Sequence, residues 1–299
     1  MLSWLAMPGR MRPILTYIAL VALLSAIPYS LILHTHTLGV GGGLITGVLM
    51  WMPATAALLC CALLRIDVAS LGWSWRPARF EALAYVLPLL YATPVYVACW
   101  IFVPGSSAAG LFASQSAKSF GMPGSPAAGA CVAIAVFATF GMVRSLASAL
   151  GEEIGWRGFL LPRLTDRFGF TGGCLISGCI WAVWHYPALL LADYNSGTPK
   201  PYALTCFTVM VIAMAFVMGW LRLKSRSLWP CALLHASHNL FVQAIFDRMT
   251  QPHTRALYVT TEFGFGLAAT IIVAAIWLTV RHPVTATEAR LPEPAALTA

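Results

Sequence analysis

The chain has 299 residues, of which 9% are Asp, Glu, Lys or Arg and 59% are apolar, aromatic or cysteine. Soluble globular chains carry about 25% charged residues, so this chain has too few charges to cover a water-facing surface. Its formal charge of +8 is spread between apolar runs and does not form one basic face. The composition excludes an ordinary soluble enzyme, argues against nucleic acid as a partner, and favours a protein dissolved mainly in the lipid bilayer.

Cysteine usage gives no sign of a disulfide framework or a zinc knuckle. All eight cysteines fall inside apolar stretches, and none has CxxC spacing. We interpret them as small residues of the core.

Apolar stretches long enough to span a membrane recur along the chain. A spanning helix needs about 20 mostly apolar residues, and the sequence predicts an all-α, polytopic membrane protein with about eight transmembrane helices. The predicted helices lie near 13–33, 39–64, 80–103, within 126–162, and at 171–192, 203–223, 228–247 and 256–280. We expect one transmembrane domain over 1–283, a stretch at 126–140 that lies outside the bilayer or re-enters it, and a disordered cytoplasmic tail over 284–299.

The distribution of basic residues predicts the orientation of these helices. With alternating spans and a cytoplasmic N-terminus, most basic residues fall on the cytoplasmic side, as the positive-inside rule requires. We therefore expect both termini in the cytoplasm, in the cytoplasmic membrane of a bacterium. The cytoplasmic set is Arg10, Arg12, Arg65, Arg76, Arg79, Arg157, Arg163, Arg167, Arg222, Lys224, Arg226, Arg281 and Arg290, against Lys118, Lys200, Arg248 and Arg255 outside, with Arg144 unassigned.

Three polar clusters interrupt spans that lipid should keep apolar. They are Gly151-Glu152-Glu153-Ile154-Gly155-Trp156-Arg157-Gly158, then Trp181 to Pro187 around His185, then His235-Ala236-Ser237-His238-Asn239. An ionisable side chain inside a span costs a few kcal/mol on insertion scales, so each requires a partner, a cavity or a function. Taken singly, each has a structural explanation as an ion pair or a satisfied hydrogen-bonding group.

The depth of the three clusters favours a common site. At about 1.5 Å per residue, Glu152 lies about 16 Å from the cytoplasmic marker Arg163, and His185 about 21 Å from Thr171. Counted from Ser227 in the same way, His235 and Asn239 lie about 12 and 18 Å deep. Three polar clusters at similar depth predict one polar site between the helices.

Helical spacing separates the roles within the first and third clusters. Glu153 and Arg157 are i,i+4 neighbours and can pair, whereas Glu152 points about 100° away and is left for chemistry. His235 and Asn239 are also i,i+4 neighbours and face the same way.

At these residues the sequence resembles the CAAX prenyl protease and bacteriocin-processing family of intramembrane proteases, also called CPBP or Abi. The family pattern is Glu-Glu-xxx-Arg, then Phe-xxx-His, then His-xxx-Asn. Glu152, Glu153 and Arg157 match the first motif, and His235 with Asn239 matches the third. His185 matches the second, although Trp181 stands where the family usually has Phe. The resemblance covers about 126–245.

This resemblance implies an endopeptidase that hydrolyses a peptide bond in a membrane-associated peptide or protein tail. It implies that Glu152 is the general base that activates water, that His185 orients this water, and that His235 and Asn239 stabilise the oxyanion. Donors held in a low-dielectric cavity stabilise such charge strongly. The pair of Glu153 and Arg157 would support the orientation of Glu152.

Alternatives from other classes remain open on the sequence. Glu152, His185 and His235 also satisfy the ligand inventory of a catalytic zinc site, although we favour a scheme without metal because His235 cannot both bind zinc and donate to an oxyanion through one nitrogen. Intramembrane Glu and His are also used by proton-coupled transporters. A membrane scaffold or immunity protein of the same fold is the third hypothesis.

Overall fold

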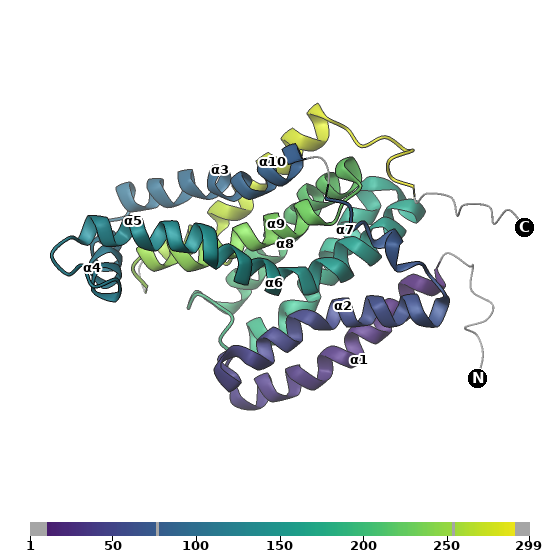
Figure 1. Ribbon diagram of the computed structural model, residues 1–299, viewed down its shortest axis with the longest axis horizontal. Coiled ribbons are helices and arrows are strands. Elements are labelled where there is room, and N and C mark those ends of the chain that lie inside the picture. The colour runs from purple at the N-terminus through teal and green to yellow at the C-terminus, as the bar shows by residue number, and fades with distance from the viewer. Residues whose placement is uncertain (1–10, 76–77, 253–254, 291–299) are drawn as a thin grey trace, which may run out of the picture.

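The computed structural model describes residues 11–75, 78–252 and 255–290, and these residues form an all-α protein (Figure 1). Within these ranges the only β pairing is an isolated bridge between Ser107 and Thr250. The helices are α1 (Arg12–Thr35), α2 (Leu44–Leu64), α3 (Ala78–Phe102), α4 (Ala109–Ser119), α5 (Pro126–Val136), α6 (Met142–Glu153), α7 (Leu161–Leu191), α8 (Lys200–Ser225), α9 (Trp229–His238) and α10 (Phe265–Arg281). The predicted basic positions Arg10 and Arg76 lie outside the described residues.

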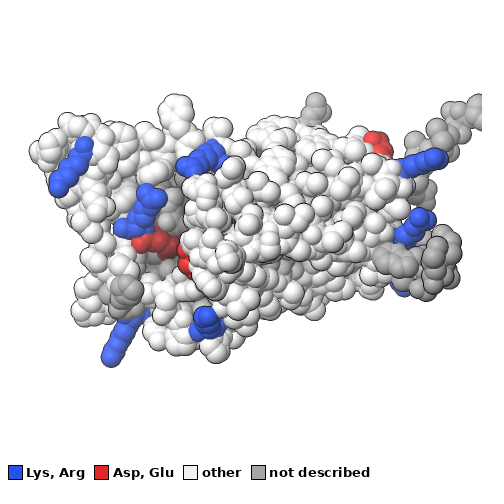
Figure 2. Space-filling view, turned by 90° about the horizontal axis from the view of Figure 1, so that it is seen from below, with Lys and Arg blue, Asp and Glu red and all other residues white. Residues whose placement is uncertain are grey.

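Length and composition mark several helical stretches as membrane spans. Among the described residues, five are long and apolar enough to cross a bilayer: Arg12–Thr35, Val40–Leu64, Ala78–Phe102, Pro126–Leu191 and Lys200–Ser225. Large apolar side chains such as Leu23 and Val280 point outward, and Lys and Arg lie toward the two ends with an uncharged band between them (Figure 2). The chain is therefore an integral membrane protein, as the composition predicts.

The stretch Pro126–Leu191 consists of two helical rods, one before and one after Gly169. Gly169 has φ 70° and ψ 175°, a conformation suited to glycine, and it separates the first turns of α7 from the rod that follows. Before this break, α5, the π-helical segment η4 (Phe137–Gly141), α6 and the π-helical segment η5 (Ile154–Leu160) run on from one another. Residues 126–140 thus continue into the rod that carries the first motif, and α5 also packs against α4, a short helix that hydropathy did not predict.

The last helix begins later than hydropathy predicts. Residues 255–258 form a single 3-10 turn and α10 begins only at Phe265. A Cβ on Gly264 would lie 2.1 Å from the carbonyl oxygen of Thr260, so the chain is folded tightly on itself here. The predicted span over 256–280 is wrong in its first turns, because an apolar stretch does not reveal a compact turn within it.

The helix with the first motif lies close to α2 because two glycines leave room for it. A Cβ on Gly151 would lie 2.7 Å from the carbonyl oxygen of Met50, and one on Gly155 would lie 2.6 Å from the backbone carbonyl carbon of Pro53. Such small residues four apart let membrane helices approach each other closely. On other sides α6 packs against α9, and α7 packs against α8.

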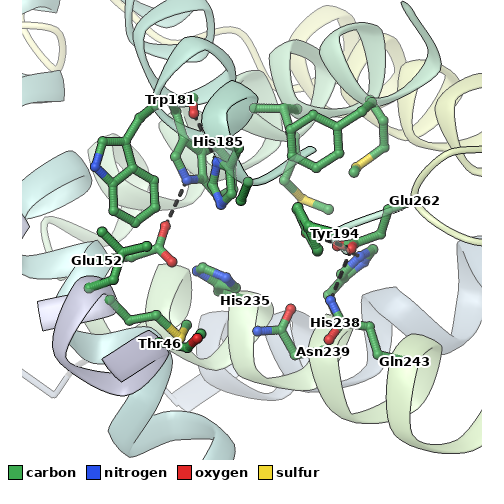
Figure 3. Close-up of a pocket in the computed structure, with 18 of the residues that line it drawn as sticks. Thr46, Glu152, Trp181, His185, Tyr194, His235, His238, Asn239, Gln243 and Glu262 are labelled. Carbon is green, nitrogen blue, oxygen red and sulfur yellow. Dashed lines mark hydrogen bonds and ion pairs between the residues drawn. The ribbon is translucent and has the colours of Figure 1, made fainter. Parts of the chain in front are cut away.

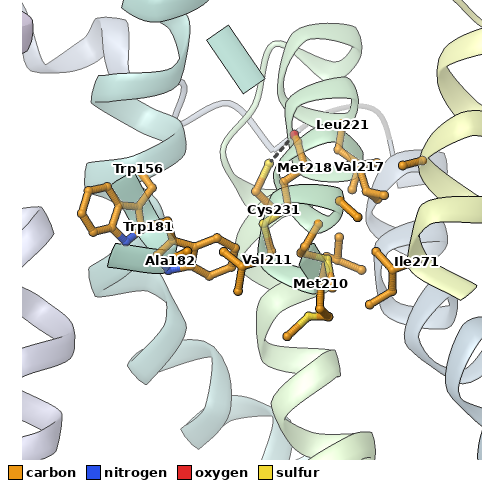
Figure 4. Close-up of a cluster of buried hydrophobic side chains, with 14 of the residues drawn as sticks. Trp156, Trp181, Ala182, Met210, Val211, Val217, Met218, Leu221, Cys231 and Ile271 are labelled. Atoms are coloured by element: carbon orange, nitrogen blue, oxygen red, sulfur yellow. Dashed lines mark hydrogen bonds between the residues drawn. The ribbon is translucent and has the colours of Figure 1, made fainter. Parts of the chain in front are cut away.

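The buried apolar core surrounds the polar clusters. Trp156 and Trp181 pack toward Val211 and Met218 of α8, and the thiol of Cys231 donates to the carbonyl oxygen of Met218 (Figure 4). All eight cysteines are free, but Cys131 and Cys179 are exposed. The prediction that every cysteine belongs to the core is wrong for these two, because a lipid-facing position is as apolar in sequence as a core position.

The segment after α10 returns to the end of α8. Lys224 donates to the Glu288 carboxylate at 2.8 Å and to the carbonyl oxygen of Pro283 at 2.8 Å, and Trp220 donates to the carbonyl oxygen of His282. These contacts hold the first residues of the predicted tail. Residues 291–299, on which the rest of that prediction falls, lie outside the described residues.

Candidate active site

A cavity of about 190 Å³ lies between the helices that carry the three motifs (Figure 3). Glu152 of α6, His185 of α7, His235 of α9 and Asn239 of the π-helical segment η6 (Asn239–Phe246) all line it. Its apolar wall includes Met210, Met214 and Met218 of α8. The structure thus brings together all four residues that the sequence singles out for catalysis.

Glu152 has one engaged and one open carboxylate oxygen. Its Oε2 accepts a hydrogen bond from Trp181 Nε1 at 2.8 Å and a longer one from Trp156 Nε1 at 3.3 Å. Its Oε1 has no hydrogen-bond partner within the described part of the chain, and the residue is 2% exposed. The carboxylate is therefore fixed by neutral donors while one oxygen stays available to the cavity.

Glu153 points away from Glu152 and bonds with two other side chains. Its Oε1 accepts from Arg157 at 2.9 Å, the expected i,i+4 pair, and also lies 2.8 Å from His235 Nδ1. The guanidinium carbon of Arg157 stacks 3.9 Å from the ring centroid of Trp181. The contact between Glu153 and His235 joins α6 to α9, and no sequence spacing could have indicated it.

The hydrogen bond of His185 fixes its tautomer. Its Nδ1 lies 2.9 Å from the carbonyl oxygen of Trp181, which can only accept. Nδ1 therefore carries the proton, and in the neutral ring Nε2 presents a lone pair. His185 is thus arranged to accept a hydrogen bond from a water molecule.

The hydrogen bond of His235 places its ring proton in the same way, but its partner is a carboxylate. Its Nδ1 donates to the Glu153 carboxylate, so Nε2 accepts when the ring is neutral and donates only when the ring is an imidazolium. A carboxylate at this position favours the imidazolium. Across the described residues the Asn239 side chain makes no hydrogen bond, so its amide remains free to donate into the cavity.

The helices that carry the first and third motifs both change from α-helical to π-helical geometry at the site. The segment η5 begins directly after Glu153, and η6 begins at Asn239. π-helical turns occur mostly as single-turn bulges inside α-helices, and such bulges are frequent at functional sites. Hydropathy and spacing did not indicate these bulges.

A second carboxylate, which the sequence analysis did not single out, lies at the other end of the cavity. Glu262 accepts hydrogen bonds from His238 Nε2 at 3.0 Å, from the Tyr194 hydroxyl at 2.7 Å and from Gln243 Nε2 at 3.0 Å. All four residues line the same cavity. The available signal was an acidic residue within a predicted span.

The zinc alternative requires at least three converging ligands. Over the described residues, no group of three or more His, Cys, Asp or Glu side chains is placed to hold a metal ion. Glu152, His185 and His235 share one cavity but do not form such a group, and Glu152 Oε2 is already taken by two indole donors. The described residues are thus not grouped as zinc ligands, and the scheme without metal stays a prediction.

Fold and cavity together define a polytopic membrane protein that encloses carboxylates, histidines and an amide between its helices. Residues 134–241 match the sequence profile of the type II CAAX prenyl endopeptidase Rce1-like family. CAAX prenyl protease 2 of Methanococcus maripaludis is 26% identical over 84 residues, which is 27% of this chain and 31% of that relative. The match thus spans about a third of the relative's length.

Over residues 134–241 the chain is therefore similar to the Rce1-like CAAX prenyl endopeptidase family. The matched region contains Glu152, His185, His235 and Asn239. It excludes Glu262.

Proposed function

We propose that the protein is an intramembrane endopeptidase that hydrolyses a peptide bond in a membrane-associated peptide or protein tail. The observation that carries this proposal is the open Oε1 of Glu152 in one cavity with the open Nε2 of His185 and the free amide of Asn239. The name of the methanococcal relative and the family match agree with a peptidase.

Water activation uses the two open acceptors. A single water molecule binds here, with one of its hydrogens donated to Glu152 Oε1 and the other to His185 Nε2. A lone pair of the water oxygen is then directed toward the substrate carbonyl. As the carbon–oxygen bond forms, Glu152 takes the first proton as general base. The indole donor from Trp181 keeps the carboxylate in place during this step.

The tetrahedral intermediate carries its charge on the former carbonyl oxygen. Asn239 Nδ2 donates to this oxyanion, and His235 donates from Nε2 as an imidazolium that Glu153 stabilises. The carbon–nitrogen bond then breaks, and the proton held by Glu152 passes to the leaving amine. Glu152 returns to the carboxylate form, so the cycle balances without another reactant.

The proposed reaction needs no metal. Metal content measured by mass spectrometry on active, detergent-purified protein, together with turnover after exhaustive chelation, tests this point. We expect activity to survive chelation. Stoichiometric zinc whose removal abolishes turnover and whose return restores it would overturn the scheme and make Glu152, His185 and His235 ligands.

We further propose that the protein resides in the cytoplasmic membrane of a bacterium with both termini in the cytoplasm. The support is the excess of basic residues on one set of loops. Cysteine labelling in intact cells should place Arg163 and Arg226 inside and Lys200 and Arg248 outside. A loop labelled from the wrong side would contradict this orientation.

The substrate is best sought by its change in mass. Membrane proteomes from cells with the wild-type protein, with Glu152→Gln and without the protein should differ in at least one peptide or protein tail that is shortened only by the wild type. Purified protein should then cleave that tail in detergent. Identical proteomes, combined with no cleavage of a synthetic tail library, would contradict peptidase activity.

A further inference from the structure

Glu262 lies across the cavity from Glu152, on the chain between the turn Arg255–Tyr258 and α10 (Figure 3). The residue is 7% exposed and lines the cavity. Both of its carboxylate oxygens are held by donors from His238, Tyr194 and Gln243. The catalytic scheme uses none of these four side chains, so their arrangement requires a separate explanation.

The hydrogen bonds around His238 indicate that its ring is neutral. Its Nε2 donates to Glu262, and its Nδ1 lies 2.6 Å from the Tyr91 hydroxyl. In a neutral ring, the hydroxyl proton of Tyr91 is donated to Nδ1 and every group is satisfied. In an imidazolium, Tyr91 would have to accept, and its own buried proton would be left without a partner. His238 therefore does not neutralise Glu262.

Among the described residues of the cavity wall, the other proposed cation is the His235 imidazolium, which is paired with Glu153 and not with Glu262. The lining residues include Glu152 and Glu262 but no Lys or Arg. Three donors, from His238, Tyr194 and Gln243, point at this one carboxylate and favour its ionised form. A buried carboxylate that stays ionised without a cation is costly, so this end of the cavity is electrostatically prepared for a positive charge.

Three acceptors remain open around this charge. A carboxylate accepts about four hydrogen bonds, and Glu262 receives three from the protein, one of them on Oε1. The Gln243 amide turns its Nε2 to Glu262, which leaves its Oε1 directed elsewhere and without a hydrogen bond in the described part of the chain. Asn239, one helical turn earlier, also presents an open amide oxygen.

The shape of the site favours ammonium over guanidinium. A guanidinium binds a carboxylate best as a fork on both oxygens, but Glu262 Oε2 already accepts from Tyr194 and Gln243. An ammonium needs only single acceptors arranged around it. The rings of Tyr194 and Phe207, whose centroids lie 5.7 Å apart, line the same cavity and add aromatic faces that attract cations.

We propose that the Glu262 end of the cavity is a subsite for a primary ammonium group of the substrate, supplied by a lysine side chain or by a free amino terminus. The inference rests on the proposed function, because the ammonium belongs to the chain that is cleaved. It adds a requirement for positive charge near the scissile bond, at a position set by the distance between the two ends of the cavity.

Binding of small probes tests the subsite without any hydrolysis. Isothermal titration calorimetry at fixed pH on detergent-purified protein would compare n-butylammonium with n-butanol, its neutral counterpart of similar size. We expect the wild type to bind the ammonium at least about tenfold more tightly, the effect of one hydrogen bond to a charged group. Equal affinity for the two probes would overturn the proposal.

Four variants locate the effect. Glu262→Gln should remove the preference for ammonium, whereas Glu262→Asp and Tyr194→Phe keep the charge and should keep the preference. Glu152→Gln should also keep it. If Glu152→Gln abolishes the preference and Glu262→Gln does not, the cation binds at the other end and the proposal is wrong. Unfolding followed by tryptophan fluorescence confirms that each variant is folded.

Cleaved peptides then identify the source of the ammonium. Replacing lysine by norleucine tests the side chain, and acetylating the amino terminus tests the terminus. One of the two changes should lower kcat/KM at least about tenfold for the wild type and not for Glu262→Gln. If neither change has this effect, the subsite does not select substrates. If the protein hydrolyses nothing but still prefers ammonium, the proposed function fails while the site stands.

Discussion

The two ends of the cavity each hold a buried carboxylate, but the two carboxylates are bonded differently. At one end Glu152 has a single engaged oxygen, and its neighbours His185 and Asn239 keep open hydrogen-bonding atoms. At the other end Glu262 has both oxygens engaged, and both ring nitrogens of His238 are occupied. In the proposed scheme, Glu152 at the first end exchanges a proton with water, whereas Glu262 at the second end keeps its negative charge.

A similar difference separates the adjacent residues Glu152 and Glu153. Both are buried, but Glu153 bonds with Arg157 and His235, whereas Glu152 bonds only with neutral indoles. The two carboxylates therefore differ in their hydrogen-bond donors and not in their burial. Substitutions that change one donor or one carboxylate at a time should separate the roles.

The largest effect should come from Glu152→Gln. The amide oxygen of glutamine can still accept from Trp181, so the side chain should keep its place, but the base is gone. We expect turnover to fall at least about 10²-fold while the unfolding midpoint in detergent stays near that of wild type. Turnover is measured on the identified tail or on a synthetic peptide. Near wild-type turnover would exclude Glu152 as the base.

Glu153→Gln should instead reduce both stability and activity. The substitution leaves the fully buried Arg157 without its carboxylate and removes the charge that favours the His235 imidazolium. Removing one partner of a buried ion pair costs about 3–5 kcal/mol. Denaturation in detergent measures the loss, with Glu152→Gln as the matched control on the neighbouring residue. Wild-type stability of Glu153→Gln would show that the pair does not hold the two helices together.

Hydropathy and motif spacing predicted the parts of the fold and site that depend on local sequence. The long apolar stretches are helical, and the four residues of the motifs that were predicted to be catalytic line one cavity, because each motif lies at a similar depth on its own helix. The partnership of His235 with Glu153 joins separate helices, so it has no periodic signature. The outward positions of Cys131 and Cys179 were also hidden, because lipid and core are equally apolar environments.

Glu262 shows a different limit. An acid in a predicted span is a recognisable signal, but its donors come from three other segments, and only the fold shows that they surround it. Trp181 is a similar case. In sequence it is one aromatic residue in place of another, whereas in the structure its indole nitrogen bonds with Glu152.

Trp181→Phe should have an intermediate effect. It restores the residue usual in the resembled motif and keeps a ring against Arg157, but it removes the shorter of the two donors on Glu152 Oε2. Loss of about 1 kcal/mol of positioning corresponds to roughly a fivefold lower kcat, with little change in KM. Steady-state kinetics test this, with Trp156→Phe, which removes the longer bond, as the milder control. An unchanged kcat would show that Trp181 does not position the base.

The smallest effect should come from Tyr91→Phe, at the end of the cavity that holds a fixed charge. The variant removes the hydroxyl that donates to His238 Nδ1 but leaves Glu262 with all three of its donors. One buried hydrogen bond contributes about 1 kcal/mol, so stability should fall by about that amount. The hydroxyl touches no group assigned to the reaction, so kcat should remain within about twofold of wild type. A fall in kcat as large as that of Trp181→Phe would mean that the two ends of the cavity are coupled, and His238 would then belong to the catalytic apparatus.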